Sequence, residues 1–169
     1  MIQGLAPLLS ADTRLLVLGS FPGVASLRAQ QYYGHPQNQF WKIVGTLLAT
    51  EAASVLALPY PERAQWLLDQ GVGLWDVYAA CEREGSLDAH IQNAQPNDLS
   101  SLSLRCPDLV TIAHNGGESF KHAKHTRALG LPVYRLPSTS PANASWSFQR
   151  KLDAWREVFQ ATGLITAIA

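Results

Sequence analysis

The chain has 169 residues, of which 47% are hydrophobic and 15% charged, and its formal net charge is zero. This length accommodates one domain with a substantial core and leaves no room for a second, and the composition is that of a globular rather than a disordered protein. The neutral total argues against a protein that coats nucleic acid through bulk electrostatics, but not against one with a local basic face.

Neither a membrane anchor nor a bound metal is indicated. No apolar run approaches the roughly 18 residues that span a bilayer, and the first residues lack the basic segment of a signal peptide. We therefore expect a cytoplasmic protein without a membrane partner, and a monomer by default. Cys81 and Cys106 are too few for a disulfide framework or an iron–sulfur cluster and too widely spaced for a zinc knuckle, so no cofactor is expected.

The first half of the chain alternates between apolar runs and helical patterns. Arg14 to Leu18 reads as a short buried strand. A small-residue turn over 19–23 and a polar-aromatic loop follow it, and an apolar stripe then predicts a helix over 38–48. Pro61 suits the first turn of a second helix that runs to about Gln70, and 72–78 is the next short apolar segment.

The second half continues the alternation. In chain order we expect an irregular segment over 82–94, a short helix capped by Asn97 or Asp98 and running toward Leu104, a strand over 108–113, a helix over 118–129, a strand over 132–136, and a helix from Ser145 or Ser147 to about Gln160. Strands that alternate with helices predict one α/β domain, over residues 1–169, with a mainly parallel sheet.

Three loops that follow predicted strands carry small and polar residues: 19–23, 114–117 and 137–143. The carboxyl ends of parallel strands meet at one edge of the sheet, so these loops should surround one crevice, with the segment around Asp76 as a fourth wall. A single Gly/Pro turn is more often structural than functional. Together, and with polar and aromatic residues crowded beside the first loop, the three favour a ligand pocket.

Individual residues of this crevice have a structural and a functional interpretation. Asn38 can cap the helix that it precedes, or its amide can orient a water molecule. Asp76 is alone in an apolar segment and is a surface acid, a cap or a pocket acceptor, because burial without a partner is costly. Tyr33 is a core aromatic or stacks on a ring in the pocket.

Basic residues gather in and after the predicted helix over 118–129: Lys121, Lys124, Arg127 and Arg135. Glu118 is the single acid among them, and such a local excess of cations can follow a phosphate backbone. His122 and His125 share a helical face, but the cations around them disfavour a bound dication. A solvated or phosphate-facing helix is the better interpretation.

Four segments make the sequence resemble the uracil-DNA glycosylase superfamily over about residues 13–160, and within it the hypoxanthine-DNA (deoxyinosine) glycosylase family. They are Gly19-Ser20-Phe21-Pro22-Gly23, Tyr32-Tyr33-Gly34-His35-Pro36-Gln37-Asn38-Gln39-Phe40-Trp41, Gly73-Leu74-Trp75-Asp76-Val77 and Pro137-Ser138-Thr139-Ser140-Pro141-Ala142-Asn143. The second is also similar to a segment of the mismatch-specific uracil glycosylases. The resemblance implies a three-layer α/β/α sandwich around a four-stranded, mainly parallel sheet, and metal-free, monofunctional excision of a deaminated base from double-stranded DNA.

The resemblance also implies roles for residues of the base pocket. Asn38 matches the essential residue of the hypoxanthine branch, and Tyr33 the aromatic that stacks on the extruded base. Ser20 and Phe21 belong to the first motif, where other branches carry a catalytic Asp or Asn at the position of Phe21. Ser138 stands where other branches place a His or Asn, so strong activity on uracil is not expected.

DNA contacts are expected from the loop after the last strand, at Ser140, Pro141, Ala142 and Asn143, together with Lys121 and Lys124. Ala142 matches the bulky residue that some branches wedge into the helix. Because alanine fills less of the gap, we expect Pro141 and Asn143 to share that task.

Asp76 takes the position at which uracil-directed relatives often carry an Asn that reads the edge of the base. An ionised carboxylate only accepts hydrogen bonds, and both hypoxanthine and uracil present a ring N–H beside a carbonyl, whereas adenine presents a lone pair at N1. We therefore expect Asp76 to read this lactam N–H. The alternatives are a glycosylase for uracil or thymine opposite guanine, a non-catalytic module that binds damaged DNA or a nucleotide, and a generic small-ligand protein.

Overall fold

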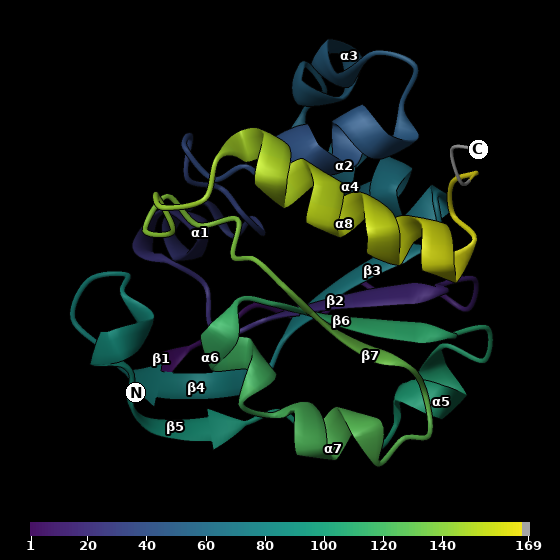
Figure 1. Cartoon of the computed structure of the whole chain (residues 1–169). Helices are drawn as coiled ribbons and strands as arrows, with labels where there is room; N and C mark the ends of the chain where they lie inside the picture. Colours follow the sequence, from purple (N-terminus) through teal and green to yellow (C-terminus); the bar gives the residue numbers. More distant parts are fainter. Residues whose placement is uncertain (167–169) are drawn as a thin grey trace.

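The centre of the computed structural model, which describes residues 1–166, is a four-stranded parallel sheet (Figure 1). Its strand order is β3-β2-β6-β7, formed by β2 (Leu15–Gly19), β3 (Val72–Asp76), β6 (Thr111–Asn115) and β7 (Val133–Leu136). Every residue of β2, β3 and β6 is buried, as expected for parallel strands that are covered on both faces. Residues 167–169 of the expected domain lie outside the described residues.

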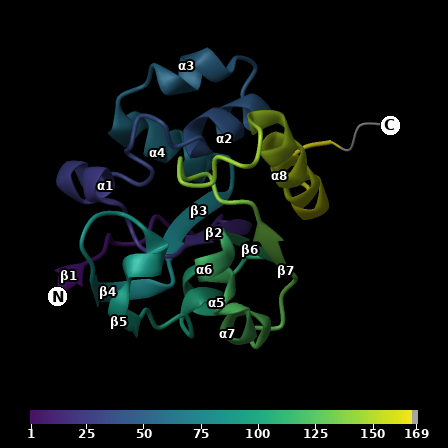
Figure 2. The ribbon, with the colours of Figure 1, turned by 60° about the vertical axis from the view of Figure 1, so that its left-hand side comes forward.

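Helices cover both faces of this sheet, so the three-layer α/β/α sandwich is confirmed (Figures 1 and 2). One layer holds α2 (Phe40–Leu48), α3 (Ala52–Leu56), α4 (Tyr60–Asp69) and α8 (Phe148–Thr162), and the other holds α5 (Leu102–Arg105), α6 (Gly117–Phe120) and α7 (Ala123–Arg127). Successive residues of β2 point into different layers: Leu15 and Val17 pack into one core and Leu16 and Leu18 into the other. None of the helices in residues 1–166 is both long and apolar enough to cross a bilayer.

A second, antiparallel sheet corrects the expectation of an irregular segment over 82–94. It pairs β1 (Ile2–Gln3) and β5 (Gln92–Pro96) with β4 (Tyr78–Glu82), and a 3₁₀ helix (Asp88–His90) lies between β4 and β5. β5 is almost entirely polar and exposed, so its sequence carries no alternating apolar pattern. Its pairing with β4 is what makes it a strand.

The helix expected over 118–129 is broken into α6 and α7, and the buried His114 explains the break. Its two ring nitrogens lie 2.8 Å from the hydroxyls of Ser119 in α6 and Thr126 in α7. In a continuous helix, residues seven apart are roughly 10 Å apart along the axis, which is more than one imidazole and its two hydrogen bonds can bridge. Burial lowers the pKa of His114 to about 4, so the ring is neutral and donates to one partner while it accepts from the other.

Other boundaries differ by a few residues. The helix expected from 38 begins at Phe40, because the backbone at 35–38 forms a turn that is closed by a hydrogen bond from the N–H of Asn38 to His35 O. α5 begins only after Ser101, and Asn97 donates its amide to Asp76 O instead of capping that helix. Ser147 caps α8 through its hydroxyl, as one of the two predicted alternatives. α1 (Val24–Ala29) and α3 were not expected.

Candidate active site

The loops that follow the strands of the parallel sheet surround one cavity, as predicted. Its walls come from the turn 19–23, the segment 32–38, the end of β3, and the loop 138–141. The rest of the lining comes from Asn115 at the end of β6, from Ser86 and Asp88 of the β4–β5 connection, and from Ala25 and Ser26 of α1. The parts of this cavity that β2, β3 and β6 carry are therefore supported by fully buried strands, the kind of element that unfolds locally least readily.

Asn38 reaches this cavity and also stabilises the start of α2. Its Oδ1 accepts the backbone N–H of Phe40 at 3.0 Å, which fixes the orientation of the side-chain amide. A carbonyl oxygen has two lone pairs, so this bond leaves one free for a water molecule. The two interpretations of Asn38, a helix cap and a residue that orients water, are therefore compatible in one conformation.

Tyr33 lines the cavity with its ring and is held at both ends. Its backbone has a φ of 54°, in the left-handed region that residues other than glycine rarely adopt. The ring packs on Phe40 with the centroids 4.2 Å apart, and the hydroxyl accepts a hydrogen bond of 3.2 Å from Asn115 Nδ2. Burial raises the pKa of Tyr33 well above its usual value, so the phenol stays neutral.

Asp76 ends β3 with a side chain that is almost fully buried. Burial, and next the negative charge of Asp88, raise the pKa of Asp76 to about 7, while Arg83 opposes the shift. Its Oδ2 has no hydrogen-bond partner within residues 1–166. Since an unpaired buried acceptor is costly, this atom, on a residue of the cavity wall, marks a place for a ligand donor. A Cβ at Gly19 would lie 2.5 Å from Asp76 Oδ1, so any larger residue there would displace the carboxyl from its present position.

Three side chains of the loop over 137–143 form hydrogen bonds within the loop. Ser138 Oγ accepts the N–H of Ser140, Ser140 Oγ accepts the N–H of Ala142, and Asn143 Nδ2 donates to Ser138 O. Pro141 and Ala142 are exposed at the tip, whereas the amide of Asn143 turns back into the loop.

Comparison with known proteins identifies the family of this fold and site. The sequence model of the uracil DNA glycosylase superfamily matches residues 6–160. The chain belongs to this superfamily. Two relatives named hypoxanthine DNA glycosylase, from Methanosarcina barkeri and Methanosarcina acetivorans, are each 36% identical over 158 residues, which are 94% of this chain and 98% of theirs. The solution NMR structure of a candidate uracil DNA glycosylase from Methanosarcina acetivorans superposes with a TM-score of 0.84 at 36% identity, covering 95% of this chain and 98% of that one.

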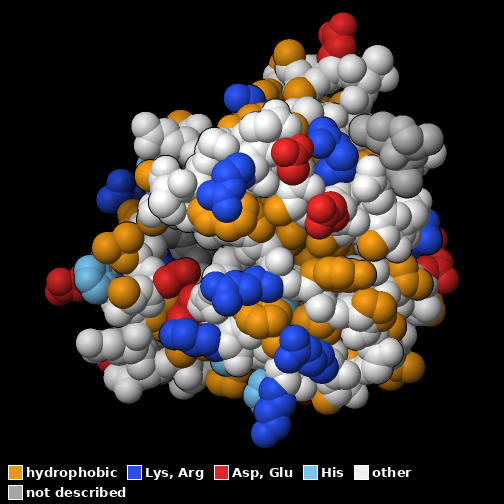
Figure 3. Space-filling view, viewed as in Figure 1, with side chains coloured by type: hydrophobic (Ala, Val, Ile, Leu, Met, Phe, Trp, Pro, Cys, Tyr) orange, Lys and Arg blue, Asp and Glu red, His pale blue; other side chains and the backbone are white. Residues whose placement is uncertain are grey.

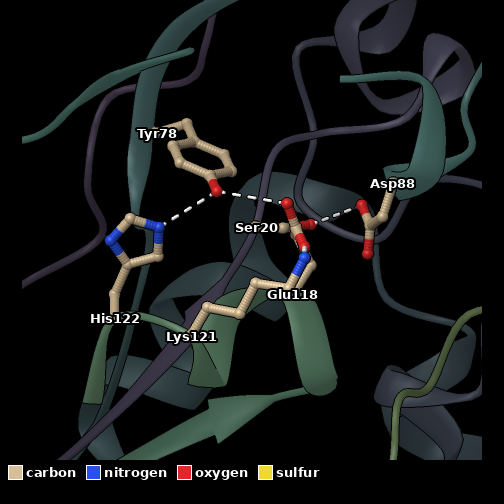
Figure 4. Close-up of polar contacts among 6 residues, drawn as sticks. All are labelled: Ser20, Tyr78, Asp88, Glu118, Lys121 and His122. Atoms are coloured by element: carbon tan, nitrogen blue, oxygen red, sulfur yellow. Dashed lines mark hydrogen bonds and ion pairs between the residues drawn. The ribbon is translucent and has the colours of Figure 1, made fainter. Parts of the chain in front are cut away.

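The four segments that resemble the superfamily do not include the β4–β5 connection, whose Ser86 and Asp88 line the cavity and were not predicted from the sequence. Asp88 Oδ1 accepts the hydroxyl of Ser20 at 2.7 Å (Figure 4), and Arg83 donates to Pro22 O at 2.6 Å. Ser86 Oγ accepts the N–H of Val24. In the sequence, the signal for this part of the site is the Gly85-Ser86 turn followed by Asp88, a pattern that is common in loops.

Asn115 was also missed, although it was noted as part of a loop. The strand expected to end at 113 continues to Asn115, so its side chain points from the end of a central strand into the cavity rather than from a turn. The signal that could have found it is a polar residue directly after a buried apolar strand.

Figure 3 shows Lys and Arg side chains gathered over the part of the molecule that holds α6 and α7. Lys121 and Lys124 are exposed, and Lys121 is paired with Glu118. The guanidinium groups of Arg127 and Arg135 lie 5.4 and 5.6 Å from the ring centre of Phe120. Of these two, only Arg135 lines a groove that continues the cavity and shares with it three residues, Asp88, Ser138 and Ser140.

His122, directly before α7, belongs to a polar network. Tyr78 donates its hydroxyl to Glu118 Oε1 at 3.2 Å and lies 3.0 Å from His122 Nε2 (Figure 4). Across residues 1–166, no three His, Cys, Asp or Glu side chains lie together in a way that could hold a metal ion.

Proposed function

We propose that this chain is a monofunctional glycosylase that excises hypoxanthine from deoxyinosine in double-stranded DNA, as the first step of base excision repair. The observation that carries the proposal is the buried, unpartnered oxygen of Asp76 in a cavity that also presents Asn38 and Tyr33. The two relatives named hypoxanthine DNA glycosylase support the same substrate, since the similarity extends over nearly the whole of both chains.

Base recognition follows from the chemistry of these walls. The target base must first leave the stack, at a cost of a few kcal/mol that is lowest for mispaired bases. The ring of Tyr33 offers it a face for stacking. The ionised Asp76 then accepts the N1–H of hypoxanthine, whereas the lone pair at N1 of adenine would face a carboxylate and leave two acceptors unpaired.

Cleavage breaks the bond between C1′ of the sugar and N9 of the base. The bonding electrons leave with the base, and positive charge develops on the sugar. Water adds to C1′, and the proton that it loses balances the proton that the departing base takes up, so the products are free hypoxanthine and an abasic site. An amide is too weak a base to deprotonate water early, so the second lone pair of Asn38 Oδ1 positions the water while the bond breaks first.

Single-turnover cleavage of labelled duplexes tests the proposal. The duplexes carry deoxyinosine, deoxyuridine, deoxyadenosine or thymidine opposite a defined base, and alkali converts abasic sites into strand breaks. We expect product from deoxyinosine and little from the others, and none from any duplex with Asn38→Ala. Product mainly from deoxyuridine would assign the chain to the uracil-directed class, and no product with tight binding to an abasic duplex would indicate a binding module.

A further inference from the structure

Asn115 joins two segments of the active site through a single side chain. It ends the central strand β6 and is 8% exposed. Its Nδ2 donates to the hydroxyl of Tyr33 at 3.2 Å and to Thr139 Oγ1 at 3.0 Å, and its Oδ1 accepts the N–H of Thr139 at 3.1 Å. Both donor hydrogens and one lone pair of the oxygen are thereby used.

Thr139 passes this restraint on to the segment that carries Asn38. Its side chain is buried, and its carbonyl oxygen accepts the N–H of Gln39 at 3.0 Å. Gln39 directly follows Asn38. The side chain of Asn38 accepts the N–H of Phe40, the first residue of α2. The path from β6 to Asn38 therefore consists of two consecutive hydrogen-bonded contacts and one peptide bond.

Two other hydrogen bonds anchor these segments on helices and not on β6: Trp155 Nε1 of α8 donates to Pro137 O at 3.1 Å, and the N–H of Gly34 donates to Ser26 Oγ of α1 at 3.0 Å. The side-chain bonds of Ser138, Ser140 and Asn143 lead back into their own loop or along its backbone. Tyr33 has a left-handed backbone, a strained conformation that is kept only where the surroundings impose it. Its hydroxyl is bonded to Asn115.

We propose that Asn115 is a positioning residue for excision: its amide fixes Tyr33 and Thr139 on β6, and Thr139 in turn fixes the segment of Asn38, while an extruded nucleotide occupies the cavity. The proposal rests on the proposed function, because its main readout is base excision. A displacement of about 1 Å can lower a rate by about 100-fold. We therefore expect Asn115→Ala to lower the single-turnover rate by about 10- to 100-fold and to change the affinity for an undamaged duplex by less than about twofold.

Conservative variants separate positioning from folding. Thr139→Val removes the hydroxyl that Asn115 contacts but keeps the shape and the backbone bonds, so it should slow excision, and Thr139→Ser should restore the rate. Thr13→Val is the matched control, because Thr13 is equally buried and hydrogen-bonded but lies before β2, at the other end of the strand. In the double variant Asn115→Ala/Thr139→Val, the fold reduction of the single-turnover rate should be smaller than the product of the two single reductions, because both substitutions remove the same hydrogen bond.

A second readout does not depend on activity. Hydrogen exchange followed by NMR should show the Gln39 amide exchanging faster in Asn115→Ala, with the amide of Val17 in β2 unchanged. The proposal is overturned if Thr139→Ser is as slow as Thr139→Val, if Asn115→Ala lowers the melting temperature without slowing excision, or if Gln39 exchange is unaltered. Failure of the wild-type protein to cleave deoxyinosine would refute the proposed function instead, and the exchange experiment would still decide whether the link exists.

Discussion

Replacement of Asp76 by asparagine tests the recognition of the base most directly. The substitution keeps the shape of a side chain that is 5% exposed but exchanges a group that only accepts, once ionised, for an amide that also donates. Excision that needs the carboxylate should rise with pH through about 7, the raised pKa of Asp76. In Asp76→Asn this rise should be absent, the deoxyinosine rate should fall, and selectivity over deoxyadenosine should shrink by 10-fold or more.

The same pKa predicts the stability of the variant. The folded pKa of about 7 lies above the ordinary value of 3.8, so between these pH values the unfolded chain releases a proton that the folded chain keeps. Stability of the wild type should therefore fall as pH rises from about 4 to about 7 and then level off. About three pKa units correspond to an upper limit of about 4 kcal/mol. Asp76→Asn should remove this slope and melt at a higher temperature than the wild type at pH 8.

The assays are single-turnover rates between pH 5 and pH 9 and thermal denaturation over the same range. Asp88→Asn is the matched variant, because it removes the second-largest cause of the shift and keeps an oxygen for the hydroxyl of Ser20. It should move the inflection of the rate to lower pH. An Asp76→Asn protein with unaltered selectivity and an unaltered pH profile would refute the reasoning.

Three further predictions concern other parts of the site. Asn38→Ala should abolish excision and change the affinity for the duplex by no more than a few-fold, so a loss of duplex binding would contradict the prediction. The variant should also lower the free energy of unfolding by about 1 kcal/mol, because it removes the hydrogen bond that caps α2. Arg135→Gln should weaken DNA binding and reduce its salt slope by about one, measured by fluorescence anisotropy, whereas Arg127→Gln, on the same aromatic ring, should not. Gly19→Ala should strongly reduce excision in the cleavage assay, because its Cβ would collide with Asp76; an active variant would show that the carboxyl can move.

The sequence by itself determined the architecture and the family. The alternation of buried apolar runs with helical stripes predicts an α/β domain with a mainly parallel sheet. The resemblance of four segments to the uracil-DNA glycosylase superfamily implies the three layers and the family. The turn at 19–23, the segment around Asn38, the acid of β3 and the loop after β7 were identifiable because each is contiguous in the chain. Their meeting at one cavity follows from the common direction of the strands.

Only the tertiary structure decided the features that join distant parts of the chain. Ser20 and Asp88 are 68 residues apart, and Tyr33 and Asn115 are 82 apart, so no local pattern pairs them. The strand β5 forms only because it pairs with β4. The sequence over 118–129 predicts one continuous helix, which the hydrogen bonds of His114 to Ser119 and Thr126 divide into α6 and α7. The pKa of Asp76 likewise depends on the burial of its side chain at the end of β3 and on the carboxylate of Asp88, which lies between β4 and β5. Burial and long-range contacts are properties of the folded chain, and they set the electrostatics of this site.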